Sequence, residues 1–162
     1  MHTEDALTTL FRHNLWANLE LLACCRALSS EQLDATIVGT YGAIGAMLEH
    51  IATAEQSYLA RISTGQPFRR PTDAPAPTLV DLGVSLRTTG EGLLAWAARV
   101  QPEETVIIDW DGTPRAVPKT IILTQVINHA TEHRAQITAT LTQIGIEPPN
   151  LQGWAYFDAI DR

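Results

Sequence analysis

The sequence contains few charged residues, and basic residues are the scarcer kind. Charged side chains make up 18% of the chain, and 11 Lys and Arg against 18 Asp and Glu give a formal net charge of -7. The densest basic spot is the pair Arg69-Arg70, which lies inside a proline-rich stretch. Because an acidic surface repels phosphate backbones, the composition argues against nucleic acid as a partner.

The sequence also lacks long apolar runs and is poor in cysteine. No stretch approaches the ~18 apolar residues of a transmembrane helix, and the amino-terminal residues lack the pattern of a signal peptide. We therefore expect a cytoplasmic protein that does not bind membranes. Cys24 and Cys25 are neighbours, so on a helix their side chains diverge by about 100° and suit neither a disulfide framework nor a shared metal ion.

Apolar residues, in contrast, are plentiful enough for one folded core. They make up 45% of the 162 residues, which favours a single domain spanning residues 1–162. Apolar spacings of three and four predict four long helices and an all-α fold. Their expected ranges are 3–28, 39–63, 78–100 and 118–145. The connection over residues 64–77 is rich in proline and is expected to be stiff and extended.

Two segments depart from the helical pattern. Residues 105–118 contain β-branched residues before and after Asp111-Gly112, which predicts a small β-hairpin between the third and fourth helices. Pro114 weakens the second strand of that hairpin. At the carboxyl end, Trp154, Tyr156 and Phe157 are expected to pack against the helices.

The fourth helix carries the clearest chemical signal. Its apolar face includes His129 and His133, and the i, i+4 spacing lets both imidazoles bind one metal ion. His50 lies on or beside the apolar face of the second helix and is the candidate third ligand. Three neutral imidazoles would leave a coordination position open for water or substrate, as in catalytic sites.

Other interpretations of these residues stay open. Each histidine could instead be a hydrogen-bonded core residue, and Glu49 and Glu55 could be solvated or paired within the helices. The segment 129–133 is not an HExxH motif, because its carboxylate, Glu132, follows the first histidine by three positions. Glu132 is therefore a weak candidate for a general base.

Several segments resemble the DinB family in the expected order. They are residues 14–18, 42–55 with the pattern His-Ile-x-x-Ala-Glu, 128–137, and 145–149 followed by Tyr156. The resemblance implies a four-helix bundle of the DinB/YfiT-like type, with His50, His129 and His133 at the metal-ligand positions. Glu132 stands where many relatives carry another histidine, and Ala135 where glycine is common.

The resemblance also implies a range of functions. We expect a metal-dependent enzyme, either a hydrolase or a transferase that uses a low-molecular-weight thiol, acting on a small-molecule substrate. Zinc or nickel is the expected ion, and a homodimer is one expected assembly. Arg134, Arg61 or Arg12 could bind carboxylates of a thiol cofactor, although a solvated surface position is the simpler expectation for each. The alternative function is a non-catalytic module that binds metal in a stress response or sequesters a ligand.

Overall fold

The structure is a computed structural model that describes residues 4–161, and it is mostly helical with one small antiparallel sheet. Four helices are long: α1 (Ala6–Cys25), α3 (Ile44–Thr64), α4 (Leu79–Ala97) and α5 (Lys119–Gln143). Two are short: α2 (Ser30–Leu33) and α6 (Gly153–Ile160). The predicted helical class with one hairpin is therefore confirmed.

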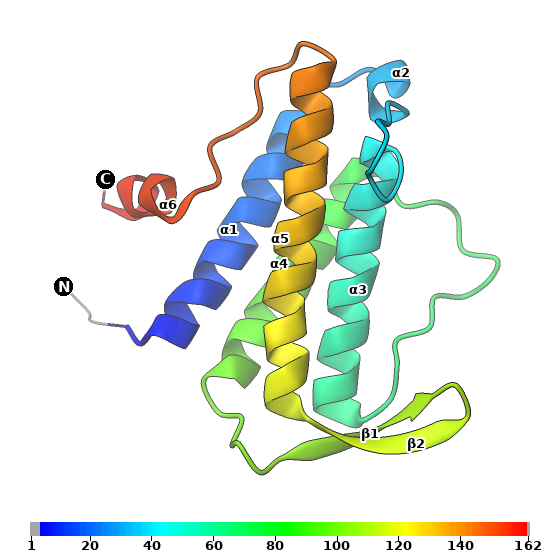
Figure 1. Ribbon diagram of the computed structural model, residues 1–162, viewed down its shortest axis with the longest axis vertical. Helices are drawn as coiled ribbons and strands as arrows, with labels where there is room; N and C mark the ends of the chain where they lie inside the picture. The colour runs from blue at the N-terminus through cyan, green and yellow to red at the C-terminus, as the bar shows by residue number, and fades with distance from the viewer. Residues whose placement is uncertain (1–3, 162) are drawn as a thin grey trace.

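The four long helices lie side by side, with the hairpin across one end (Figure 1). Helix α1 packs against α4 and α5, and α3 packs against the same two helices. Buried apolar side chains form two clusters along these contacts, one containing Leu48 and Ile137, the other Phe11 and Val126 near the hairpin. The predicted inner face of the fourth helix is correct, since Val126 and Ile137 are fully buried.

The ends of the helices follow local capping chemistry. The carboxylate of Asp5 accepts hydrogen bonds from the backbone amides of Leu7 and Thr8 and so begins α1, whereas Thr3, the predicted start, lies outside the described residues. Thr78 and Asp81 cap each other at the start of α4, which agrees with the predicted start at residue 78. Helix α3 begins at Ile44 rather than at residue 39, because Gly39 has a φ of 92°, which no right-handed helix accommodates.

The hairpin forms as predicted from strands β1 (Thr105–Trp110) and β2 (Thr113–Pro118). Asp111 and Gly112 turn the chain with φ values of 52° and 82°. Pro114 lies opposite Asp109 and is tolerated because this two-stranded sheet leaves the outer edge of β2 unpaired. Strand β2 runs directly into α5, so the hairpin is fixed to the end of that helix.

The carboxyl-terminal segment packs through one aromatic residue rather than three. Tyr156 on α6 is buried beside His13 and Trp16 of α1, with ring centroids 5.7 and 5.5 Å away. Trp154 and Phe157 are exposed, so the prediction that they pack against the long helices is wrong. A helix of two turns can direct only one side of its surface toward α1, which explains why these neighbours face outward.

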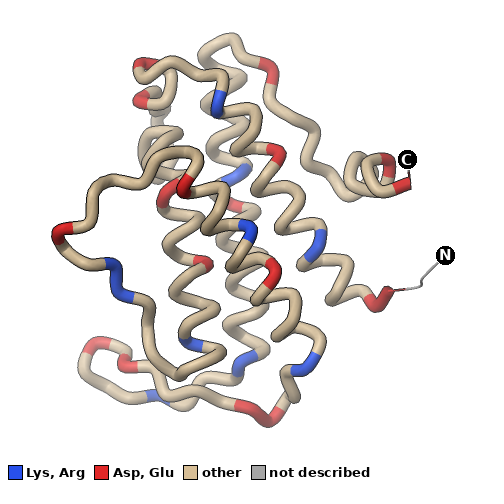
Figure 2. Tube along the Cα trace, turned by 180° about the vertical axis from the view of Figure 1, so that it is seen from behind, with Lys and Arg blue, Asp and Glu red and all other residues tan. Residues whose placement is uncertain are grey.

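Charged residues are dispersed over the surface. In Figure 2 the Lys and Arg positions alternate with Asp and Glu along several elements. Among the described residues, none of the helices combines the length and apolar character that crossing a membrane requires.

Candidate metal centre

Three histidines from two helices meet between α3 and α5. His50 comes from the first half of α3, and His129 and His133 from successive turns of α5. One ligand atom from each residue lies within 4.8 Å of the others, and the centroids of the three rings are 4.5–4.8 Å apart. The structure thus brings together the three residues that the sequence pattern selected as ligands.

The closest approach is between two ring nitrogens. Nε2 of His129 lies 2.9 Å from Nε2 of His50. Two nitrogens bound to one ion, each at about 2.0–2.1 Å, would lie roughly 3.3–3.4 Å apart in tetrahedral geometry and roughly 2.8–3.0 Å apart at an angle of about 90°. The spacing of this pair, and the imidazole character of all three donors, therefore fit a divalent transition metal ion.

One polar atom of the cluster is unsatisfied within the protein. Nδ1 of His129 is buried and has no hydrogen-bond partner in the described chain. A buried polar atom without a partner costs about 1–3 kcal/mol of stability. Coordination through Nε2 would leave the proton of this ring on Nδ1, so the argument for a metal ion rests on the facing Nε2 atoms.

Burial keeps the rings of His50 and His129 neutral at physiological pH. Desolvation lowers the pKa of His129 to about 4, and the neighbouring His133 and His50 oppose a further positive charge. Desolvation, followed by the proximity of His133, also lowers the pKa of His50. Since metal binding requires a free nitrogen lone pair, lowered pKa values keep the ligands ready at pH 7.

Two tyrosines and a glutamine surround the cluster. The ring of Tyr41 stacks on His50 at 4.3 Å, and the ring of Tyr58 meets His129 edge-on at 5.8 Å. The side-chain oxygen of Gln136 accepts a hydrogen bond from the backbone N–H of Tyr41 at 2.9 Å and lies 3.4 Å from Nδ1 of His133. Gln136 thus joins the segment before α3 to the histidine helix, and its oxygen favours a proton on Nδ1 of His133, which leaves Nε2 of that ring free.

Next to the histidines, a buried polar network crosses all four long helices. The two amide nitrogens of Asn14 and Asn18 donate to one oxygen of Glu55, at 2.8 and 2.7 Å. Their two carbonyl oxygens accept from the same nitrogen of Arg134, at 2.7 and 2.6 Å. Thr89 of α4 donates to the other oxygen of Glu55 at 3.3 Å.

The charges in this network compensate each other. Glu55 and Arg134 are 1% and 5% exposed, so neither can rely on water. Burial raises the pKa of Glu55 above its usual value, whereas the asparagines and Arg134 act in the opposite direction. Burial lowers the pKa of Arg134 to about 10, against the attraction of Glu55. Because Glu55 follows His50 in α3 and Arg134 follows His133 in α5, the network fixes the two helices that carry the ligands.

The remaining candidates from the sequence have simpler positions. Glu132 is exposed, Arg12 forms an exposed ion pair with Glu4 at 2.9 Å, and Glu49 pairs with Arg70 at 2.8 Å. Arg61 is half-buried in the second half of α3, closer to the hairpin than His50 is. The expectation that Arg134 is a solvated surface charge is wrong, because this side chain is buried in the network.

Sequence reasoning missed the roles of Asn14, Asn18 and Thr89. A signal was present, since Phe11, Asn14, Asn18 and Leu21 follow three- and four-residue spacings and are all buried in α1. Two asparagines on a core-facing stripe require buried partners. Thr89 gave no comparable signal, because threonine is common on helix surfaces.

Comparisons with known proteins agree with this arrangement. A search of curated proteins finds no match to the sequence. The DinB family model matches residues 1–162, which is the whole sequence, so the match includes all three histidines and the residues of the buried network. The chain belongs to the DinB family.

Proposed function

We propose that this protein is a metal-dependent enzyme in which His50, His129 and His133 hold one divalent transition metal ion. The observation that carries the proposal is the convergence of three imidazoles whose ligand atoms lie within 4.8 Å of one another. Imidazole suits zinc and nickel among the common ions, and these two are the expected occupants. Membership of the DinB family supports the same assignment.

The surroundings of the cluster suit catalysis better than a closed structural site. His50 and His129 are only partly buried, so each ring keeps some exposed surface. Three protein ligands leave room for a further donor. When bound, the ion would supply Lewis acidity toward a substrate atom or lower the pKa of water or a thiol.

The chain's own residues would orient and shield the reacting groups. Gln136 holds the ring of His133, and the network of Glu55 and Arg134 fixes the rotation of α3 and α5. Tyr41 and Tyr58 cover the cluster from two sides and limit the access of bulk water. We propose a small-molecule hydrolase or a transferase that uses a low-molecular-weight thiol, because a Lewis acid with a free coordination position can assist both reactions.

We also propose that the four long helices form the DinB/YfiT-like four-helix bundle and that residues 1–162 are one domain. The contacts of α1 and α3 with both α4 and α5 support this arrangement. The histidines come from α3 and α5 and the network spans all four helices, so neither would survive division of the chain.

The first experiment measures metal binding in protein purified without an affinity tag. We expect about one zinc or nickel ion per chain, and His129→Ala should weaken binding by more than the 10–100-fold typical of residues that only support a ligand. His13→Ala is the matched control, because His13 contacts the carbonyl oxygen of Leu151 on the α6 side of α1. Equal affinities of the two variants would remove His129 from the site.

The second experiment tests turnover. Zinc-loaded and nickel-loaded proteins are incubated with esters, amides and alkylating electrophiles, with and without small thiols, beside the loaded His129→Ala variant. Turnover that depends on His129 supports the enzyme. Stoichiometric metal without turnover of any substrate class would contradict it and indicate a module that stores metal or ligand.

A further inference from the structure

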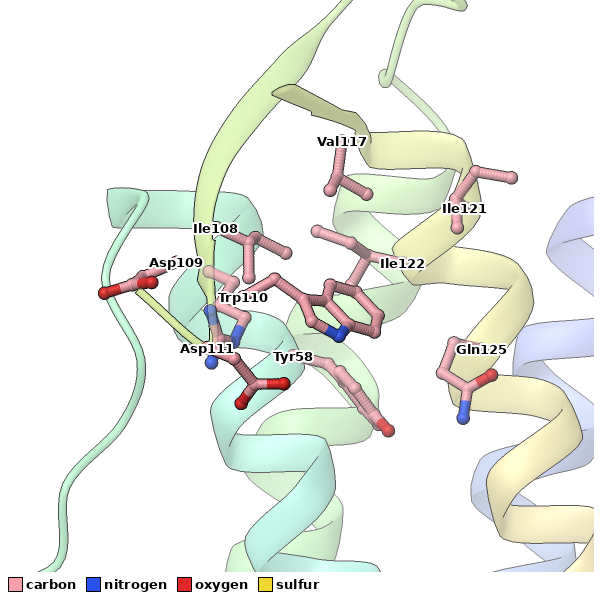
Figure 3. A pocket seen from close by; sticks show the side chains of 10 residues that line it. Tyr58, Ile108, Asp109, Trp110, Asp111, Val117, Ile121, Ile122 and Gln125 are labelled. Atoms are coloured by element: carbon pink, nitrogen blue, oxygen red, sulfur yellow. The ribbon is translucent and has the colours of Figure 1, made fainter. Parts of the chain in front are cut away.

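A pocket lies in the groove between α3 and α5, on the hairpin side of the histidines. It encloses about 500 Å³, within the range of roughly 300–1,000 Å³ typical of small-molecule sites. Side chains from α3, α5 and both hairpin strands line it (Figure 3). Its apolar wall consists of Tyr58, Ile108, Trp110, Val117, Ile121 and Ile122.

The pocket shares a wall with the histidine cluster. Tyr58 lines the pocket, and the same ring meets His129 edge-on at 5.8 Å. Gln125 and Ile122 also line it, and they precede His129 by four and seven residues, on the same face of α5. One helical turn is about 5.4 Å, so a molecule in the pocket would reach the histidines with a short extension.

The pocket presents flat apolar surface to solvent. Trp110 is 56% exposed although its ring lines the pocket, and Ile121 is exposed to the same extent. Figure 3 shows the side chains of Trp110 and Tyr58 reaching toward the same space, with Ile122 beside them. Aromatic rings arranged in this way favour a planar apolar partner, which would cover surface that water now contacts.

The charges at the pocket cancel. Arg61, Asp109 and Asp111 line it, and the guanidinium of Arg115 lies 5.8 Å from the ring of Trp110. Two cationic and two anionic side chains leave no net formal charge. A multiply charged ligand would therefore gain no long-range attraction here. It would also lose hydration against the apolar wall, which makes its binding less favourable.

We propose that this pocket binds the non-reacting part of the substrate and that this part is a flat, uncharged aromatic or heteroaromatic group. The reacting atom would then lie on the Tyr58 side, toward His129. The inference rests on the proposed function for its link to catalysis, but the binding itself requires only the pocket.

The test uses three probes that share the indole ring and differ in charge: indole, tryptamine and indole-3-acetate. Each is titrated into the metal-free and zinc-loaded protein while backbone and indole N–H signals are followed by NMR. We expect saturable shifts with millimolar indole at residues 58, 108–111 and 121–125, and weaker binding of both charged probes. Shifts elsewhere only, no shifts, or a charged probe that binds more than about tenfold tighter than indole would overturn the proposal.

Two variants assign the binding to the pocket. Trp110→Ala should weaken indole binding about 2- to 12-fold, the range expected for one lost aromatic contact, and should fold because the side chain is largely exposed. Trp154→Ala is the control, since Trp154 is an exposed tryptophan on α6 and should leave indole binding unchanged. Equal effects of the two variants would reject the pocket.

The same variants separate this inference from the metal site. Trp110→Ala should bind zinc as the parent protein does, and metal-free His129→Ala should still bind indole. If zinc binds but indole does not, the pocket assignment fails while the metal site stands. If indole binds and zinc does not, the proposed function fails and the pocket remains a separate binding site.

Discussion

Two polar regions lie next to each other among the long helices, and they differ in how their hydrogen bonds are satisfied. In the network of Glu55 and Arg134, the side-chain nitrogen and oxygen of both asparagines each have a hydrogen-bond partner within 2.8 Å. In the histidine cluster, Nδ1 of His129 is buried without a partner, and two Nε2 atoms face each other at 2.9 Å.

This difference indicates which region needs something from outside the protein. A neutral imidazole has one donor and one acceptor nitrogen, so facing Nε2 atoms must either share a proton or both direct lone pairs at a cation. The network needs no added cation, because the guanidinium of Arg134 and the carboxylate of Glu55 already satisfy the amide groups between them. The network therefore contributes to the fold, and the cluster is the place where a ligand is expected.

The largest expected effect comes from removing the positive charge of the buried network. Arg134→Met should leave the carboxylate of Glu55 buried without its cation and lower the free energy of unfolding by about 3–5 kcal/mol. Urea unfolding followed by circular dichroism measures this change. The exposed Arg87→Met is the matched control, with an expected change within about 0.5 kcal/mol. A loss as small as that of Arg87→Met would show that the network does not stabilise the fold.

A smaller effect is expected from pH in the metal-free protein. The pKa of His129 is about 4 in the folded chain and 6.5 for an unperturbed imidazole, so the unfolded chain binds more protons between these values. Stability that is present above pH 6.5 should therefore be lost as the pH falls toward 4, by about 1–2 kcal/mol for a ring that is half exposed. Unfolding in chelator-treated buffers at several pH values measures this loss. In His129→Gln the part due to His129 should vanish, and an unchanged pH dependence would contradict the assignment.

The smallest effect is expected at Glu132. This carboxylate is exposed on α5 beside His133, where solvent screens its charge. Glu132→Gln should change zinc affinity by no more than about fivefold, since an exposed charge pair contributes about 0–1 kcal/mol. Calorimetric titration at two salt concentrations measures the change. A loss comparable to that of His129→Ala would make Glu132 a ligand and would revise the triad.

Regular features of the sequence predicted the helical class, the hairpin and the proximity of the three histidines. The i, i+4 spacing of His129 and His133 fixes their common direction, and the apolar face around His50 directs it toward the same interior. The hairpin followed from the turn at Asp111-Gly112. These features are local, or depend on one helical period, and can be read without knowing which helices are neighbours.

The parts that were missed depend on contacts between distant segments. Asn14 and Arg134 are 120 residues apart, and nothing in either helix alone shows that they meet. The position of Tyr41 over His50 depends on Gln136 in α5, 95 residues further along. The exposure of Trp154 and Phe157 depends on which side of α6 faces α1, and eight residues give too short a pattern to decide it.

The continuity of β2 with α5 has a consequence for how proteins built on this plan can diversify. Asp109, Trp110 and Asp111 at the turn line the pocket, whereas the buried network takes its residues from the long helices. Lys119 closes the base of the hairpin through its bonds to Glu104. Insertions or substitutions at the turn would therefore change the shape of the pocket without repacking the core between the helices. Changes at the turn would thus leave the histidine cluster and the buried network as they are.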